Sequence, residues 1–247
     1  MRWKAARRMS LLTCEAITKR FGGLLAVSEV SFSVHNDQIL ALIGPNGAGK
    51  STILNLISGF MRPESGSVSL DGKRVDGLSP HVIAAYGVRR TFQLESLFPS
   101  LSVSENLRLG ALHSRGSPAD LAALCELIGL NGRENELAGV LPYGLRRRLA
   151  MGIALAGNPR LLLLDEPAAG LNFTESMELV ELIRTVRDAG VTVVLIEHDM
   201  AVVSRAADEV VVVDHGRVIA TGNPAEVLSD KTVVEVYLGQ WFQADAQ

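Results

Sequence analysis

Cysteine is scarce in this chain of 247 residues, which contains only Cys14 and Cys125. Two cysteines cannot form a disulfide framework, and their number is typical of a protein from a reducing compartment that does not depend on cysteine chemistry. Aromatic residues are also few, at 5%. A hydrophobic core must therefore be built from Leu, Val, Ile and Ala.

Positive charge is not in excess either. The chain has 24 Lys and Arg against 27 Asp and Glu, a net charge of −3, which argues against a nucleic-acid-binding protein that works through bulk charge. Apolar residues at 47% and charged residues at 21% lie near globular averages and exclude disorder as the main state. At roughly 150 residues per domain, the length predicts one large domain or one domain with an insertion.

Long apolar runs are absent as well. No segment approaches the roughly 18–20 unbroken apolar residues that span a bilayer, and the runs at 161–164 and 191–196 have the length of strands. Residues 1–10 are basic but contain no apolar segment, so they do not form a secretory signal. We expect them to be a disordered tail, or an extension ahead of a true start at Met9, rather than a membrane-surface anchor.

Strand-like and helix-like patterns alternate along most of the chain. The clearest helix is expected at 173–189, where the apolar residues between 179 and 186 form one stripe. Asn172 can cap its start together with Glu175, and Gly190 can end it. Strands that alternate with helices predict an α/β fold whose mainly parallel sheet is covered on both faces. The expected strands are 38–44, 88–92, 160–165, 191–197 and 209–214.

Two regions depart from this alternation. The strand-like segments 11–18, 29–34 and 67–70 have turns but no helix between them, which predicts an antiparallel β-layer beside the α/β core. Residues 101–155 contain no convincing strand, and we expect a helical insertion over about 101–157, with helices near 103–113, 119–128 and 145–156. We expect one domain over residues 11–240 and a frayed end at 241–247.

A glycine-rich loop follows the apolar strand at 39–43. Its sequence matches G-x-x-x-x-G-K-[ST] without exception, and apolar residues at helical spacing come after it. Glycines let backbone N–H groups turn inward around phosphate oxygens, and the start of the next helix adds to the positive field. Lys50 would supply charge to the β- and γ-phosphates, and the Ser51 hydroxyl would ligate Mg²⁺. The loop consists of Gly44, Pro45, Asn46, Gly47, Ala48, Gly49, Lys50 and Ser51.

Two adjacent acids end the apolar strand at 161–164. Asp165 and Glu166 beside four buried leucines are electrostatically costly unless a cation lies there. Asp165 at the strand end can hold Mg²⁺, and Glu166 can polarise an attacking water. His198 follows another apolar strand, at the edge of the sheet where ligands bind, but the local sequence leaves a solvated or helix-capping role equally open.

In combination these motifs resemble the ATP-binding subunit of an ABC transporter, over about residues 11–238. The resemblance implies an ABC ATPase fold, which is a P-loop NTPase core with an antiparallel β-layer and a helical subdomain. It also implies ATP and Mg²⁺ as ligands. The motifs in chain order are the phosphate loop extended to Thr52, Thr91-Phe92-Gln93, a signature region at 141–145, the strand and acids at 161–166, Gly170-Leu171-Asn172, and His198.

The resemblance assigns roles to single residues. It implies that Phe21 stacks on the adenine ring, for which a core aromatic is the alternative, and that Val27 packs near the ribose. Gln93 would reach Mg²⁺ or the attacking water and sense the neighbouring membrane subunit. His198 would contact the γ-phosphate, and the loop 170–172 would cross to a partner ATPase.

The signature region, residues 141–145, departs from the family's Leu-Ser-Gly-Gly-Gln pattern, because only its first and fourth residues match. Pro142 has neither a hydroxyl nor an N–H, and Tyr143 replaces a glycine. In this family the region binds the ATP held by the other subunit, so Tyr143 and Gly144 would face that nucleotide. We expect the site completed for the partner to be weakened and the chain's own site to be intact. The arginines at 146–148 are expected to be a solvated helix face, with a phosphate or interface contact as the alternative.

Finer motifs resemble the ATPases of importers for branched-chain and other hydrophobic amino acids, with relatives for urea and short amides. This implies two ATPase subunits, identical or different, that meet head to tail around two ATP–Mg²⁺. It also implies two membrane permease subunits, an external substrate-binding protein that acts through them, and a place on the cytoplasmic face of the membrane. The permease groove would lie near Gln93, with an apolar lining of Leu97, Phe98, Pro99 and Leu101. The motifs are 21–27, 90–93, 167–172, 196–200 and 236–239.

Three other interpretations stay open. The ATPase of a lipopolysaccharide exporter has a similar ending and would use two identical copies of the chain. A soluble ABC protein that acts on DNA or ribosomes usually carries two ATPase domains or a long coiled-coil insertion, which this chain lacks. A nucleotide-binding regulator without turnover is disfavoured by the presence of Lys50, Asp165, Glu166 and His198.

Overall fold

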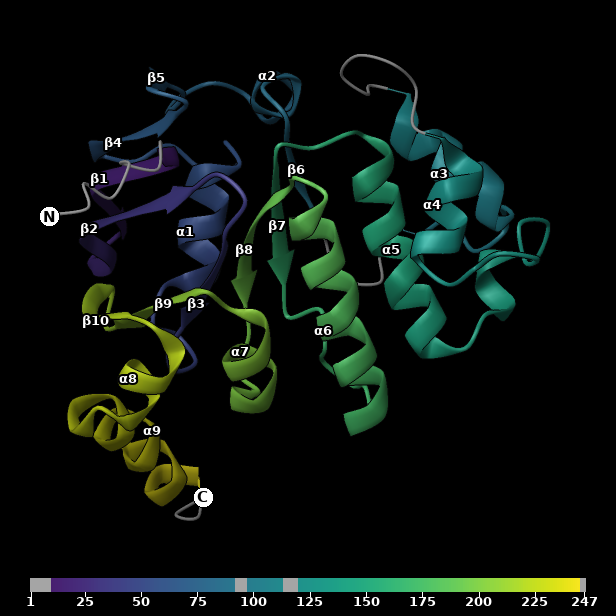
Figure 1. Ribbon diagram of the computed structural model, residues 1–247. Coiled ribbons are helices and arrows are strands. Elements are labelled where there is room, and N and C mark those ends of the chain that lie inside the picture. The colour runs from purple at the N-terminus through teal and green to yellow at the C-terminus, as the bar shows by residue number, and fades with distance from the viewer. Residues whose placement is uncertain (1–9, 92–96, 113–119, 245–247) are drawn as a thin grey trace, which may run out of the picture.

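The computed structural model describes residues 10–91, 97–112 and 120–244 of the chain. Several sequence-based expectations lie outside these residues: Gln93 and its neighbour Phe92, the tail before Ser10, the end of the helix expected to reach 113, the first residue of the one expected from 119, and residues 245–247. The described chain is organised around two β-sheets (Figure 1).

A six-stranded sheet lies at the centre of the fold, and its strands follow the order β10-β9-β3-β8-β7-β6. Five strands run parallel, and β10 pairs antiparallel with β9 at one edge. The predicted mainly parallel sheet is confirmed, with strand ends within two residues. The sequence pattern does not predict β10, because its residues are half-buried or exposed and lack apolar alternation. The strands are β3 (Ile39–Ile43), β6 (Val88–Arg90), β7 (Leu161–Asp165), β8 (Thr192–Ile196), β9 (Glu209–Asp214) and β10 (Arg217–Gly222).

A four-stranded antiparallel sheet accompanies the first one, as predicted. Its order is β2-β1-β4-β5, and β1 pairs with both β2 and β4. β1 and β2 are longer than expected, because register shifts, one of them between Cys14 and Ile17, let the ladder continue past irregular points. The strands are β1 (Ser10–Phe21), β2 (Leu24–His35), β4 (Ser65–Leu70) and β5 (Lys73–Arg74).

Apolar side chains cover both faces of the six-stranded sheet, as predicted. Alternate residues of a strand point to opposite faces. Leu161 and Leu163 therefore pack toward α1 (Lys50–Ile57) and the antiparallel sheet, whereas Leu162 and Leu164 pack toward the helices of the other face. Each fully buried leucine contributes about 1.5–3 kcal/mol, so β7 is firmly held up to its acidic end. The helices on the second face are α5 (Tyr143–Ala156) and α6 (Phe173–Asp188), with α7 (Met200–Ala206), α8 (Pro224–Ser229) and α9 (Lys231–Ala244) beside β9.

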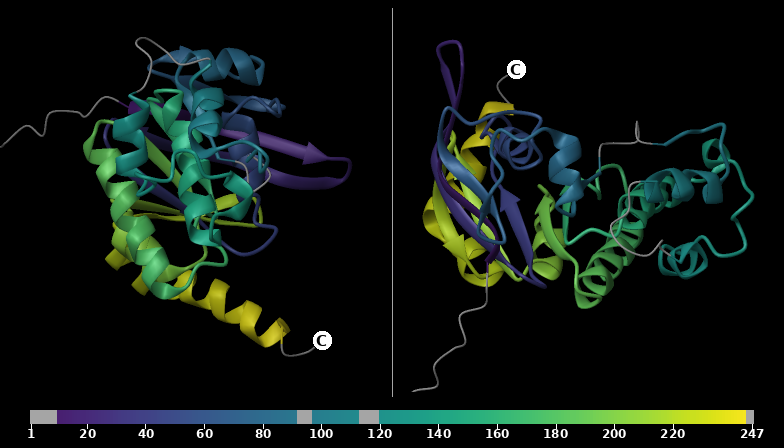
Figure 2. Two further views of the ribbon diagram at one scale, coloured as in Figure 1. Left: turned by 90° about the vertical axis from the view of Figure 1, so that its right-hand side faces the viewer. Right: turned by 90° about the horizontal axis from the view of Figure 1, so that it is seen from above.

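The helical region lies on the side of the molecule away from the antiparallel sheet (Figure 2, right view). It contains α3 (Val103–Ala111), α4 (Leu121–Leu127), a short 3-10 turn (Ala138–Val140) and α5. The three predicted helices are present here, and α5 begins two residues earlier than expected. α2 (Pro80–Ala85) precedes β6, and its buried Ile83 packs in the core cluster that contains α1 and the antiparallel sheet. None of the helices in the described ranges combines the length and apolarity needed to cross a bilayer.

The predicted capping of α6 is confirmed. The Asn172 side chain accepts the Glu175 N–H at 3.0 Å, and the Glu175 carboxylate accepts the Asn172 N–H at 3.0 Å. This capping box satisfies two backbone donors at the helix start. Gly190 follows the helix end with φ of 92°, a conformation that favours glycine. The cap fixes where the loop after β7 ends, which matters for the site described next.

Candidate active site

Three functional segments meet at the carboxyl edge of the parallel sheet. β8 pairs with β3 on one side and with β7 on the other, and Ile196 lies opposite both Leu42 and Asp165. The residues that follow these three strands are therefore neighbours: the phosphate loop (residues 44–51) after β3, the loop 166–172 after β7, and His198 after β8. Ligands bind at this edge in open α/β sheets.

The phosphate loop has a backbone that only glycine can follow at two points. Gly44 has φ of 150°, and a Cβ there would lie 1.9 Å from the Val213 carbonyl oxygen. Gly49 has φ of 103°, and a Cβ there would lie 2.4 Å from the Ala26 carbonyl oxygen. Gly49 is also the N-cap residue that directly precedes α1. The helix N-terminus and its free N–H groups thus face the loop, the arrangement that suits a bound phosphate.

Residues of the loop differ in exposure. Ala48 is buried and its N–H donates to the Pro45 carbonyl at 3.1 Å. Asn46, Gly47 and Ser51 are exposed, and Thr52 is half-buried. The tip of the loop and the first hydroxyl of α1 are therefore accessible to a ligand, while the base of the loop is anchored in the core.

Lys50 is buried, with 7% of its surface exposed. Its ammonium donates to the carbonyls of Gly44 at 2.6 Å and Pro45 at 2.9 Å. Burial lowers the pKa of Lys50, whereas the nearby carboxylates of Glu166 and Asp165 act in the opposite direction. The positive charge is thus held close to the loop and to the acidic pair.

Asp165 is held by an ion pair that the sequence does not foretell. Arg90, at the end of β6, places its guanidinium 2.8 Å from the Asp165 carboxylate and also donates to the Asn55 side chain of α1 at 2.5 Å. Both charged side chains are largely buried, at 8% and 19% exposure. Arg90 therefore connects the acidic strand end to the helix that follows the phosphate loop.

Glu166 and His198 face each other. Glu166 has φ of 48°, and its N–H donates to the Ile196 carbonyl at 3.0 Å. Its carboxylate lies 3.8 Å from Nδ1 of His198, and the two side chains are 35% and 58% exposed. Asp199, not His198, caps α7, because its carboxylate accepts the N–H groups of Ala201 and Val202. The helix-capping alternative for His198 is therefore wrong.

The signature region contacts the loop 166–172 within the same chain. The Tyr143 hydroxyl donates to the Ala169 carbonyl at 2.9 Å, and Arg147 donates to both groups, at 2.8 Å and 3.2 Å. A Cβ on Gly144 would lie 2.9 Å from a carboxylate oxygen of Glu175. The signature region thus packs against the loop 166–172 and the start of α6.

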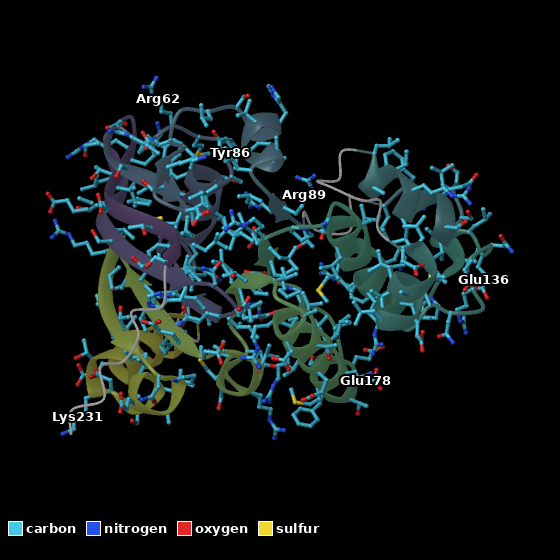
Figure 3. All side chains as sticks on the ribbon, turned by 45° about the horizontal axis from the view of Figure 1, so that its top comes forward. Arg62, Tyr86, Arg89, Glu136, Glu178 and Lys231 are labelled. Atoms are coloured by element: carbon cyan, nitrogen blue, oxygen red, sulfur yellow. The ribbon has the colours of Figure 1, made fainter. Side chains whose placement is uncertain are left out.

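The arginines at 146–148 do not form a solvated face, so that expectation is wrong. All three are only partly exposed. Arg147 bonds to Tyr143 and Ala169, Arg146 lies 5.9 Å from the centre of the Tyr143 ring, and Arg148 forms an ion pair with Glu178 of α6 (labelled in Figure 3). The charge run is a packing surface between α5 and the elements that follow β7.

Tyr143→Phe is expected to lower the free energy of unfolding by about 1 kcal/mol, because it removes one donor to Ala169 and one acceptor for Arg147. Urea unfolding measures this as a lower midpoint at an unchanged slope. Tyr86→Phe, at a partly exposed tyrosine labelled in Figure 3, is the matched control and should leave the midpoint unchanged. Equal midpoints for the two variants would contradict a stabilising role for the Tyr143 hydroxyl.

Phe21 and Val27 lie in different environments. Phe21 ends β1 with 45% of its surface exposed, and the Lys19 ammonium lies 5.9 Å from its ring centre. The alternative of a core aromatic is therefore wrong, and the ring is free for stacking. Val27 is fully buried, and its side chain would lie 3.5 Å from a Cβ on Gly49. Val27 thus supports the phosphate loop from inside the core.

The donor set fits Mg²⁺ better than a metal held by protein alone. In the part of the chain that the structure describes, no group of three or more His, Cys, Asp or Glu side chains is arranged to hold a metal ion. Ser51 and Asp165 offer one hydroxyl and one carboxylate. Mg²⁺ takes oxygen ligands and is usually bound by one or two protein groups together with substrate phosphates and water. The residues present therefore fit a Mg²⁺ ion that is bound with a nucleotide.

Comparisons with known proteins agree with this geometry. A profile described as ABC transporter matches residues 27–169, and one described as branched-chain amino acid ATP-binding cassette transporter matches residues 217–240. The chain is 40% identical over 251 residues to the high-affinity branched-chain amino acid transport ATP-binding protein BraF of Pseudomonas aeruginosa, which covers 93% of this chain and 98% of BraF. The lipopolysaccharide export ATP-binding protein LptB of Haemophilus influenzae is 34% identical, over 95% of this chain and 100% of LptB.

Solved structures show the same likeness. The ADP conformation of MJ1267, an ATP-binding cassette of an ABC transporter, superposes with a TM-score of 0.86 at 31% identity, over 94% of this chain and 99% of that one. The likeness extends over almost the whole length of both chains, so it includes both sheets and the helical region.

Proposed function

The chain belongs to the ABC transporter family, and on that premise we propose that it is the ATP-hydrolysing motor subunit of an importer for branched-chain or other hydrophobic amino acids. The observation that carries the proposal is the meeting of Lys50, Glu166 and His198 at one edge of the sheet. A general base beside a phosphate-binding lysine is the arrangement that hydrolysis of a nucleotide requires. The similarity at 217–240 to branched-chain amino acid transporters supports the choice of cargo.

The phosphate loop and Lys50 would bind the β- and γ-phosphates. Asn46 and Gly47 of the loop are exposed, and Thr52 lies in the first turn of α1. Ser51 and Asp165 would hold Mg²⁺, which when bound neutralises charge that develops on the phosphates. Arg90 would keep the Asp165 carboxylate oriented for this role, and the exposed ring of Phe21 would stack on the adenine.

Glu166 would act as the general base. Its carboxylate is partly exposed and can accept a proton from a water that attacks the γ-phosphate. His198, 3.8 Å away, would donate a hydrogen bond to the γ-phosphate. Gln93 would complete the site as a ligand of Mg²⁺ or of the water. Because Glu166 and His198 come from neighbouring strands, their distance depends on the sheet and on the two loops alone.

A second ATPase subunit would complete the site from outside. We propose that two ATPase subunits meet head to tail, so that Tyr143 and Gly144 of one chain face the ATP of the other. Pro142 supplies no backbone N–H to that nucleotide, which favours a weaker site on the partner's ATP and a partner with a more usual signature region. Two identical subunits are the alternative.

An exposed apolar surface supports docking to a membrane permease. Phe98, Leu137 and Val140 are 54%, 47% and 70% exposed. Their segments are joined, because the Gly139 N–H donates to the Pro99 carbonyl at 3.0 Å, and buried Asn106 bonds to both backbone groups of Phe98. We propose that two permease subunits dock here on the cytoplasmic face of the membrane, with a substrate-binding protein on the far side.

The uptake of labelled leucine tests the direction and the cargo. Deletion of the gene from its own organism should reduce uptake to background, a wild-type copy should restore it, and a Glu166→Gln copy should not. Unchanged uptake together with loss of surface lipopolysaccharide would overturn the importer and support the exporter that LptB serves, an alternative with a relative of nearly equal coverage.

A further inference from the structure

Glu197 is a buried carboxylate without a role in the hydrolysis steps proposed above. It follows β8 directly and is 1% exposed. A buried carboxylate is costly unless its oxygens are hydrogen-bonded. The groups that donate hydrogen bonds to the Glu197 carboxylate therefore indicate the role of this side chain.

Both oxygens of Glu197 accept backbone N–H groups, and the two donors come from different segments. Oε1 accepts the Ala168 N–H at 2.8 Å, and Oε2 accepts the His198 N–H at 3.1 Å. Burial raises the pKa of Glu197, while these two N–H groups, the charge of His198 and the N–H of Asp199 act in the opposite direction. An ionised carboxylate has acceptors on both oxygens, whereas a protonated one has to use one oxygen as a donor.

The loop 166–172 is thereby attached to the end of β8 at two successive points. The Glu166 N–H bonds to the Ile196 carbonyl at 3.0 Å, and the Ala168 N–H bonds to the Glu197 side chain. Between these attachments lies the residue that follows Glu166, and beside them lies His198. A loss of the second attachment would leave the backbone free to shift on both sides of the Glu166–His198 pair.

We propose that Glu197 is a positioning residue for ATP hydrolysis, whose carboxylate holds the loop after Glu166 and the backbone of His198 at a fixed separation. The inference rests on the proposed function, since it requires that Glu166 and His198 act in hydrolysis. A displacement of about 1 Å at a reacting group can lower a rate roughly a hundredfold. Glu197 would act through the 3.8 Å separation of Glu166 and His198 and would not touch ATP.

Glu197→Gln tests this with little change of shape. The amide keeps one acceptor but turns an N–H group toward one of the two backbone donors. We expect single-turnover ATP hydrolysis per bound nucleotide to fall about 10–100-fold, while the dissociation constant of a fluorescent ATP analogue changes less than about threefold. Counting bound nucleotide per chain removes any misfolded fraction from the rate. Glu197→Asp keeps the charge but has a shorter side chain. It should also lower the hydrolysis rate and leave the dissociation constant nearly unchanged.

Glu209→Gln is the matched control. Glu209 is a partly buried carboxylate of the same sheet that accepts the Gln38 side chain at 2.7 Å, at the opposite end of the strands. This variant should keep the wild-type rate. If Glu197→Gln also keeps the wild-type rate, the positioning role is overturned.

A double-mutant cycle with His198→Ala distinguishes positioning from general loosening of the fold. If Glu197 acts through the Glu166–His198 pair, Glu197→Gln should cost less than about threefold in the His198→Ala background, because the pair is already broken. If the double variant instead loses the product of the two single rate losses, the inference is overturned. A wild-type chain that binds ATP but shows no turnover when assembled with its ATPase partner and permease subunits would contradict the proposed function itself. An active wild-type complex with an equally active Glu197→Gln complex would contradict only the role of Glu197.

Discussion

Glu166→Gln is expected to lower ATP turnover by about 10²–10⁴-fold and to leave ATP binding intact. General-base catalysis contributes rate factors of this size, and the amide cannot take a proton from water. The substitution is isosteric, and the backbone at this position is held by the Glu166 N–H bond to Ile196 rather than by the side chain. Phosphate release under saturating ATP measures turnover, and titration with a fluorescent ATP analogue measures binding.

Glu126→Gln is the control for this change. Glu126 is an exposed residue of α4 in the helical region, and its substitution should alter neither quantity. If Glu166→Gln keeps wild-type turnover, Glu166 is not the general base. If binding is lost together with turnover, its main contribution is to the nucleotide site rather than to proton transfer.

The same variant reports on the partner. Light scattering of Glu166→Gln with and without ATP would show whether the trapped nucleotide brings two copies together. A monomer that becomes a dimer would show that the chain closes on itself despite Pro142 and Tyr143, which favours two identical subunits. A chain that binds ATP and stays monomeric would favour a different ATPase as the partner.

The sequence predicts those parts of the site whose required residues are adjacent along the chain. The phosphate loop needs glycines at positions where a Cβ would meet the backbone of Val213 or Ala26. The acids need the end of a buried strand, and the apolar run at 161–164 marks it. His198 could be placed at the sheet edge from its strand alone, but its proximity to Glu166 depends on the register of β7 and β8.

Contacts between distant segments carry no such signal. Arg90 lies 75 residues before Asp165, and nothing in its neighbourhood indicates an acidic partner. Tyr143 and Ala169 are 26 residues apart, and the run of arginines at 146–148 resembles a solvated helix face until the loop 166–172 is folded against it. Glu197 is one acid in a polar stretch, and only its burial shows that it is an acceptor for two segments.

Lys50→Met is the second substitution with a large expected effect. It removes the charge and keeps most of the apolar stem, so ATP affinity should fall by about 2–4 kcal/mol, or roughly 30–1,000-fold. Isothermal titration of ATP gives this directly. Lys73→Met, at an exposed lysine of β5, should bind ATP as the wild type does.

Lys50→Met lowers ATP affinity, but it should not lower the stability of the nucleotide-free chain. Burial lowers the pKa of Lys50, which means that the folded state disfavours its charged form, so removing the charge should leave thermal stability unchanged or higher. ATP at a hundred times its Kd stabilises a protein by about 2.7 kcal/mol. After a hundredfold loss of affinity, the same concentration gives only about 0.4 kcal/mol, because the Kd now equals it. In thermal unfolding, Lys50→Met should therefore keep the wild-type midpoint without ATP and lose most of the rise in midpoint that ATP gives the wild type. A lowered midpoint without ATP would show that Lys50 stabilises the loop through the Gly44 and Pro45 carbonyls more than its burial costs.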